Sequence, residues 1–198
     1  LLVNNETVFQ ENDIVYFISL KESIDIINKI CGKENFKIKD IMILGGSRIG
    51  LYTAELLENE YRVTIVEKDK ERCDEIAGYL NKTLVINMDG HDVQMLEEEG
   101  LTEMDALISV TADSEMNIMS SLVGKKHGIK KTIARIENFD YIHLSQSIGV
   151  DTLINKKIIA ASDIFKFVRK GNVSSVSNFH GVDAEIIDFV VNEGSKVT

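Results

Sequence analysis

What the chain lacks removes several classes of protein from consideration. Its 198 residues include no proline, no tryptophan and only two cysteines. These two, Cys31 and Cys73, are far apart and belong to no CxxC pair, so neither a disulfide framework nor a structural zinc site is expected. We expect two reduced thiols, as in a cytosolic protein.

The chain also lacks an excess of basic residues and any long apolar run. It has 22 lysines and arginines against 32 acidic residues, a formal net charge of −10. Nonspecific binding to nucleic acid or anionic lipid requires clusters of lysine and arginine, so no nucleic-acid partner is expected. No stretch approaches the roughly 20 apolar residues that cross a bilayer. We therefore expect no direct membrane insertion.

Apolar runs alternate regularly with segments of helical spacing from residue 38 onward. The runs predict six strands, over residues 41–44, 62–66, 83–87, 106–110, 131–136 and 151–155. Between them the spacing predicts five helices, over residues 49–57, 69–80, 91–100, 113–128 and 139–149. Such alternation implies parallel strands joined by right-handed crossovers. The predicted fold is a doubly wound, Rossmann-like α/β sheet.

The stretch "IMILGGSRIG" (41–50) joins the first predicted strand to the first of these helices. A phosphate bound at a helix N-terminus needs free N–H donors and no Cβ in its way. Gly45 permits the tight turn, and Gly50 allows close packing of the helix on the sheet. The remaining candidates in this turn offer backbone N–H groups or, in the case of the arginine, a charge for a phosphate: Gly46, Ser47, Arg48 and Ile49.

Ser47 is the unusual residue of this turn. A dinucleotide-binding turn has glycine at its first, third and sixth positions, and Ser47 occupies the third. Its hydroxyl could donate to a phosphate oxygen, or its Cβ could hold a pyrophosphate away. A purely structural turn between a strand and a helix remains the alternative.

Acidic residues follow the next two predicted strands. Glu67 lies 22 residues after Gly45, where a carboxylate accepts hydrogen bonds from ribose hydroxyls and repels a 2′-phosphate. This position favours NAD(H), or another nucleotide with an unphosphorylated ribose, over NADP. Asp89 is expected beside the adenine, where it can accept from the amino group. The predicted site also includes their neighbours Lys68 and Gly90.

Two polar residues complete the candidate site. Asn117 is expected to face the crevice from the first turns of a helix that Asp113 caps. Arg135 stands in an apolar strand, where a buried arginine needs a partner; it either pairs with an acid or reaches a ligand phosphate. The end of the fourth strand is expected to lie over the crevice with Val110, Thr111 and Ala112.

Taken together, these motifs resemble the RCK (or KTN) domain of TrkA-type regulators of Trk potassium uptake systems. The resemblance spans roughly residues 38–170 and is carried by "VEKD", "MDGHD", "TADSEMN" and "IAR" more than by the glycines. The family usually has glycine where Ser47 stands. Because the family's glycine would lie against the pyrophosphate, serine at this position affects how tightly the turn contacts that group.

The resemblance implies a regulatory role. Members are cytosolic subunits that bind NAD, NADH or adenine nucleotides such as ATP and ADP, and they form dimers or larger rings beneath a membrane K⁺ transporter of the TrkH type. Ligand binding would gate the transporter through a conformational change of paired domains, from the inner face of the plasma membrane. The alternative is an NAD-dependent oxidoreductase, which needs an acid or base near the nicotinamide. No such catalytic residue stands out, so no enzyme is expected.

The resemblance also implies the domain organisation. Residues 1–36 resemble the end of a small, β-rich TrkA-C-like domain, whose last helix would be 21–32. Residues 37–155 form the nucleotide-binding TrkA-N domain, 156–171 the crossover helix and 172–198 the start of a second TrkA-C-like domain. We expect the chain to be the middle of a longer protein.

Overall fold

The computed structural model describes residues 3–10, 13, 15, 17–32, 36–138, 141, 148–168, 173–178, 185–189, 191 and 194. The chain divides into two compact units, Leu1–Lys37 and Ile38–Thr198.

The first unit contains the predicted N-terminal helix. The 3-10 helix η1 (Lys21–Ser23) leads directly into α1 (Ile24–Ile30), which confirms the helix expected over residues 21–32. Among the described residues before Lys21 there are a turn and irregular backbone but no strand. The β-rich character expected of residues 1–36 therefore stays a prediction.

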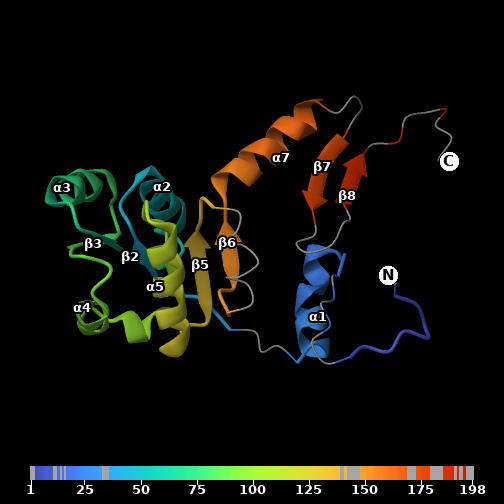
Figure 1. Cartoon of the computed structure of the whole chain (residues 1–198), viewed down its shortest axis with the longest axis horizontal. Helices are drawn as coiled ribbons and strands as arrows, with labels where there is room; N and C mark the ends of the chain where they lie inside the picture. The colour runs from blue at the N-terminus through green and yellow to red at the C-terminus, as the bar shows by residue number, and fades with distance from the viewer. Residues whose placement is uncertain are drawn as a thin grey trace. The chain divides into compact units, whose positions relative to one another are not determined.

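The second unit is built on the predicted parallel sheet. Its six strands are β1 (Asp40–Leu44), β2 (Arg62–Glu67), β3 (Leu84–Asn87), β4 (Ala106–Ser109), β5 (Lys131–Arg135) and β6 (Thr152–Ile154). They lie in the order β3-β2-β1-β4-β5-β6, and each neighbouring pair is parallel (Figure 1). This confirms the doubly wound, Rossmann-like fold. The order reverses between β1 and β4, where such sheets bind ligands at the carboxyl ends of the strands.

Helices connect these strands as the sequence predicts. They are α2 (Arg48–Leu57), α3 (Lys70–Tyr79), α4 (Val93–Glu98) and α5 (Ser114–Lys126), with the short 3-10 helix η2 (Leu101–Glu103) before β4. Most of the helix predicted over residues 139–149 lies outside the described residues.

Local side-chain chemistry sets the ends of these helices. Asp69, Asp92 and Asp113 are the N-caps of α3, α4 and α5, and each carboxylate accepts from the backbone N–H three residues later. The predicted cap Asp113 is thus confirmed. Gly100 and Gly128 follow α4 and α5 with positive φ angles of 87° and 85°, a conformation that glycine adopts without steric cost.

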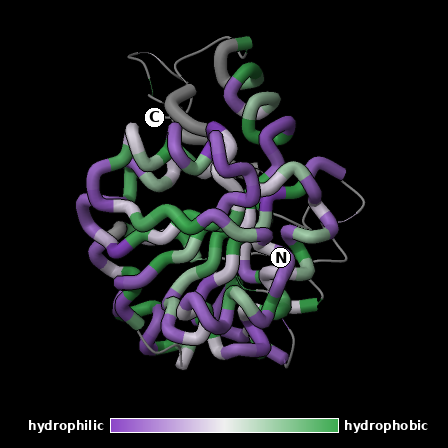
Figure 2. Tube along the Cα trace, turned by 90° about the vertical axis from the view of Figure 1, so that its left-hand side faces the viewer, coloured by the Kyte–Doolittle hydropathy of each residue, from purple (hydrophilic) through white to green (hydrophobic). Residues whose placement is uncertain are grey.

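The core has one layer on each face of the sheet. In β1, Ile41 and Ile43 point to the face where Ala54 of α2 and Ile76 of α3 pack. Met42 and Leu44 point to the opposite face, against residues that include Leu96 of α4. Side chains alternate across a strand, so a strand buried on both faces must be apolar at every position, as "IMIL" is. Figure 2 shows hydrophobic residues along these central strands.

The last part of the chain contains a helix and a hairpin-like pair of strands. Helix α7 (Lys156–Val168) confirms the helix expected over residues 156–171, of which 169–171 lie outside the described residues. Strands β7 (Val173–Asn178) and β8 (Glu185–Phe189) pair antiparallel. Strand β7 was not predicted, because the serines of "VSSVSN" leave no clear apolar alternation. None of the helices in the described ranges is long and apolar enough to span a membrane.

Candidate functional site

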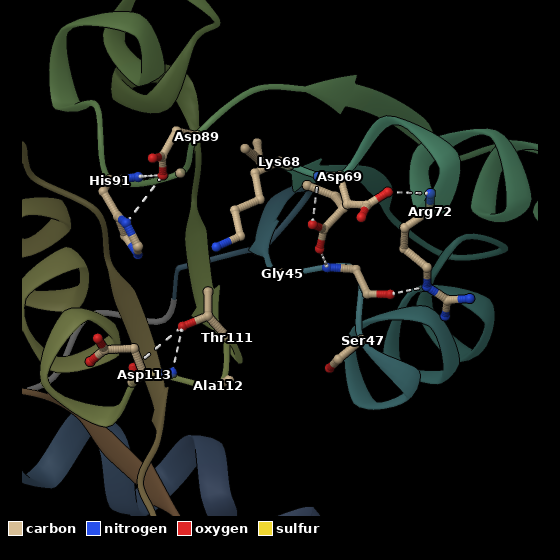
Figure 3. A pocket seen from close by; sticks show the side chains of 14 residues that line it. Gly45, Ser47, Lys68, Asp69, Arg72, Asp89, His91, Thr111, Ala112 and Asp113 are labelled. Carbon is tan, nitrogen blue, oxygen red and sulfur yellow. Dashed lines mark hydrogen bonds and ion pairs between the residues drawn. The ribbon is translucent and has the colours of Figure 1, made fainter.

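A cavity of about 440 Å³ lies at the carboxyl ends of β1, β2, β3 and β4 (Figure 3). It opens at the point where the strand order reverses, which is where the sequence places the candidate site. The residues that line it are Gly45, Gly46, Ser47, Val66, Glu67, Lys68, Asp69, Arg72, Asp89, Gly90, His91, Thr111, Ala112 and Asp113.

Two glycines of the turn are required by the backbone. Gly45 has a φ of +104°, and a Cβ there would lie 3.0 Å from the backbone nitrogen of Thr111. A Cβ on Gly50 would lie 2.0 Å from the carbonyl oxygen of Gly45. The first glycine therefore makes the tight turn and the second allows the helix to approach the strand, as the motif predicts.

Gly46 is held on both sides by side chains that follow β2. Its N–H donates to Oε2 of Glu67 at 2.6 Å, and its carbonyl accepts from Nε of Arg72 at 2.7 Å. The glycine motif predicts a free Gly46 N–H for a phosphate, and the structure corrects that prediction. The N–H is already paired, because Glu67 lies directly across the turn.

Ser47 begins α2 as its N-cap residue and is exposed. Its side chain makes no capping hydrogen bond. The hydroxyl lies 3.5 Å from the carbonyl oxygen of Val110, at the outer limit of a hydrogen bond. Arg48 and Ile49 follow in the first turn of α2; both are exposed and neither lines the cavity.

Glu67 connects the glycine turn to the start of α3. While Oε2 accepts from Gly46, Oε1 accepts from the backbone N–H of Asp69 at 2.9 Å. A carboxylate offers about four acceptor sites, so Glu67 retains capacity for hydroxyl donors. Figure 3 shows the neighbouring Lys68 with its side chain extended over the cavity, between Asp89 and Gly45.

The end of β3 contributes Asp89, Gly90 and His91 to the cavity. Oδ1 of Asp89 accepts from the backbone N–H of His91 at 3.0 Å and lies 3.1 Å from its Nδ1. His91 was not among the predicted site residues, although it lines the cavity. Its position two residues beyond Asp89, past a strand end, was the available signal.

Asn117 holds the end of β4 rather than lining the cavity. Its side-chain oxygen accepts from the backbone N–H and the hydroxyl of Thr111, at 3.0 and 2.7 Å. Its amide nitrogen donates to the carbonyl oxygens of Thr111 and Arg135, at 3.1 and 2.9 Å. The side chain is 1% exposed, so it shapes the wall that Thr111 presents.

Arg135 also lies behind this wall. Its Nη1 donates to the carbonyl oxygen of Thr111 at 3.0 Å, and its Nη2 pairs with Glu137. Of the two alternatives that the sequence left open, the structure shows the ion pair. Hydrogen bonds from Lys156 and Arg135 lower the pKa of Glu137. Neither Arg135 nor Val110, which are both buried, lines the cavity.

Three charged lining residues were not among the predicted ligand contacts: Asp69, Arg72 and Asp113. Asp69 and Asp113 reach the cavity because the helix N-termini that they cap face the same edge of the sheet. Hydrogen bonding from the backbone N–H of Met116 lowers the pKa of Asp113. Arg72, in the first turn of α3, turns back toward the glycine turn and had no sequence signal of its own.

Comparison with known proteins places this geometry in a family. The family model for the TrkA-N domain matches residues 41–156, more than half of the chain. A Trk system potassium uptake protein, trkA homolog 1 of Methanosarcina mazei, is 29% identical over the whole chain, which covers 49% of that protein. TrkA of Haemophilus influenzae is 34% identical over 94% of the chain and 41% of its own length. The chain thus spans about half or less of these relatives' length.

Solved structures share the fold. The TrkA-N domain of the inner membrane protein ybaL from Escherichia coli has a TM-score of 0.59 at 14% identity, covering 68% of this chain and all of that one. The GsuK channel bound to NAD has a TM-score of 0.57 at 20% identity, covering 68% of this chain and 24% of that one. The relatives are named for potassium uptake and not as enzymes. By its glycine turn, its strand order and these matches, the chain belongs to the TrkA-N domain family.

Proposed function

We propose that this chain is a nucleotide-binding regulatory part of a Trk-type potassium uptake system. It binds NAD(H), or alternatively ATP or ADP, in the cavity at the ends of β1 to β4. Binding shifts the arrangement of paired domains in a homodimer or larger ring, and that shift gates a membrane K⁺ transporter of the TrkH type from the cytoplasmic side. The relatives' names and a related channel bound to NAD support this proposal.

The observation that carries the proposal is the position of Glu67. Glu67 is the last residue of β2 and lines the cavity, and its Oε2 lies 2.6 Å from the backbone nitrogen of Gly46. A ribose diol beside Glu67 can donate to the acceptor sites that Gly46 and Asp69 leave open. The residues fit the ligand class, because the same turn brings the N-terminus of α2 to the place where a phosphate would follow the ribose.

The cavity supplies binding rather than chemistry. Asp89 and His91 lie on the side where the sequence places the adenine, and Thr111 and Ala112 form the opposite wall. A ligand can change the arrangement of paired domains only if it binds one arrangement more tightly than the other. Regulation therefore requires that some of these contacts differ between the two arrangements.

Calorimetric titration with NAD⁺, NADH, ATP and ADP tests the proposal. We expect at least one of the four to bind with micromolar affinity, and we expect Glu67→Gln to weaken it. Glu71→Gln is the matched control, since Glu71 has the same charge on the first turn of α3 but does not line the cavity. Absence of binding by all four ligands at high micromolar concentration would reject nucleotide sensing by this domain.

Gating is tested in the full-length protein with its transporter. Potassium flux is measured in vesicles with and without the nucleotide that binds most tightly. The proposal expects a flux change that Glu67→Gln reduces and Glu71→Gln does not. A potassium flux that does not depend on nucleotide would contradict regulation of the transporter, even if the domain binds the nucleotide.

A further inference from the structure

We propose that Arg72 is a positioning residue for phosphate recognition. It fixes the peptide unit between Gly46 and Ser47 so that the N–H of Ser47 faces the cavity. The inference rests on the proposed function, because it concerns the phosphate part of the same ligand. It assigns a task to a side chain that the glycine motif does not include.

The two peptide units of the glycine turn are held by different partners. In the first, between Gly45 and Gly46, the N–H donates to Glu67 and the carbonyl faces Gly50, where a Cβ would come within 2.0 Å of it. In the second, between Gly46 and Ser47, the carbonyl accepts from Nε of Arg72 at 2.7 Å. The orientation of the second unit therefore depends on Arg72.

A peptide unit is planar, so the hydrogen bond that Arg72 donates to the Gly46 carbonyl also sets the direction of the Ser47 N–H. This unit is trans, like the other peptide bonds of the described residues, and in a trans unit the carbonyl and the N–H point in opposite directions. Figure 3 shows Arg72 on the side of Gly45 and Ser47 that is remote from Thr111 and Asp89. A carbonyl that points to Arg72 thus directs the N–H of Ser47 toward the open cavity.

This N–H is available to a ligand. Within the described ranges of the chain, no carbonyl or side-chain acceptor is paired with the N–H of Ser47. Ser47 is also the N-cap of α2, so its N–H stands beside the first unpaired donors of that helix. Such a group of donors binds a phosphate through the backbone, whatever the side chain at position 47.

Arg72 is itself held in place. Its backbone N–H donates to the cap Asp69 at 3.0 Å, and its Nη1 pairs with Glu75 at 2.6 Å. Its side chain is 29% exposed, against 67% for Glu75. Since the planar guanidinium is anchored at Nη1, little freedom remains to be lost when Nε donates to Gly46.

The test separates the phosphate from the rest of the nucleotide. ADP and adenosine are titrated against the wild-type protein and Arg72→Met, with amide NMR shifts as the readout so that millimolar affinities are measured. We expect ADP to bind about three- to tenfold more weakly to the variant, the loss of one ordered hydrogen bond. Adenosine, which lacks the phosphates, should bind with affinity that is unchanged within about twofold.

Two further variants guard against a general loss of structure. Arg72→Lys retains a donor for the Gly46 carbonyl and should recover part of the ADP affinity. Arg62→Met is the matched control, because Arg62 pairs with Asp40 at the other end of β2, does not line the cavity and should leave ADP affinity unchanged. In the wild type, ADP should shift the Ser47 amide resonance downfield, and Arg72→Met should reduce that shift.

The outcomes distinguish this inference from the proposed function. If the wild type binds ADP and Arg72→Met binds it equally well, the positioning role is wrong and nucleotide binding stands. If the variant loses ADP and adenosine affinity equally, Arg72 has only a structural role and the inference is also wrong. If the wild type binds no nucleotide at all, the proposed function fails, and this inference fails with it.

Discussion

Asn117 and Thr111 form a closed pair at the edge of the cavity. The Asn117 side chain accepts from the Thr111 N–H and hydroxyl and donates to the Thr111 carbonyl, all within 3.1 Å. A fourth bond, to the carbonyl of Arg135, ties the pair to β5. One amide therefore fixes both the end of β4 and its spacing from the next strand.

Replacing Asn117 with alanine should destabilise the domain. The change removes four hydrogen bonds made by a residue that is 1% exposed, and we expect the free energy of unfolding to fall by about 2–4 kcal/mol. Urea unfolding followed by circular dichroism measures it. Asn59→Ala is the control, because Asn59 is exposed and its side-chain oxygen accepts from Lys82, which is itself at the surface. A loss below about 0.5 kcal/mol, as is usual for surface changes, would contradict this account.

Gly50 and Gly78 should respond in opposite ways to alanine. At Gly50 the new Cβ would meet the Gly45 carbonyl at 2.0 Å, so we expect a loss of about 1–3 kcal/mol from overpacking. At Gly78, inside α3, a Cβ has no atom within 4 Å, and alanine should stabilise the helix by up to about 1 kcal/mol. Thermal unfolding of both variants measures the two shifts. Equal shifts of the same sign would contradict the close approach at Gly50.

Asp105 should make stability depend on pH at the acidic end. A hydrogen bond from Lys130, together with those from the backbone of Lys39 and Asp40, lowers the pKa of Asp105 from 3.8 to about 2. A carboxyl whose pKa is lowered by folding stabilises the folded state above its unfolded pKa. This contribution is lost as the pH falls from about 4 to about 2.

The Asp105→Asn variant isolates that contribution. Urea unfolding at several pH values between 7 and 2 should show a constant difference between wild type and variant above pH 5. The difference should shrink below pH 4, because protonated Asp105 loses its advantage. A difference that stays constant down to pH 2 would show that Asp105 is not the group responsible.

Ser47→Gly should have little effect on nucleotide affinity. The Ser47 hydroxyl makes only a 3.5 Å contact with the Val110 carbonyl, and the residue is exposed, so its Cβ has room. Glycine also retains the backbone N–H and costs only a few tenths of a kcal/mol as an N-cap. Calorimetry should show a change of less than about threefold. A larger loss would mean that the hydroxyl binds the phosphate directly.

Much of the fold was predictable because its signals are local. The apolar run 41–44 requires a strand buried on both faces, and Asp69 and Asp113 each cap a helix within three residues of themselves. Strand β7 was missed because its serines carry no alternation of apolar and polar residues. Parallel pairing then followed from the alternation of strands and helices.

The site was predictable only in outline. The sequence placed Glu67, Asp89 and Thr111 at one edge of the sheet, because the carboxyl ends of parallel strands meet there. It did not predict which N–H and hydroxyl groups would donate hydrogen bonds to the side chains at this edge. Arg72 and Gly46 are 26 residues apart, and their hydrogen bond depends on how α3 lies against the turn.

The sequence by itself determined the order of strands and helices, the position of the glycine turn and the family to which the chain belongs. Periodicity, caps and spacing are read within a few residues, and they fix which segments exist. Only the tertiary structure decided that Glu67 takes the Gly46 N–H, that Arg72 holds its carbonyl and that Asn117 supports Thr111. These contacts join residues on different elements, so they exist only once the packing has set the direction of each side chain.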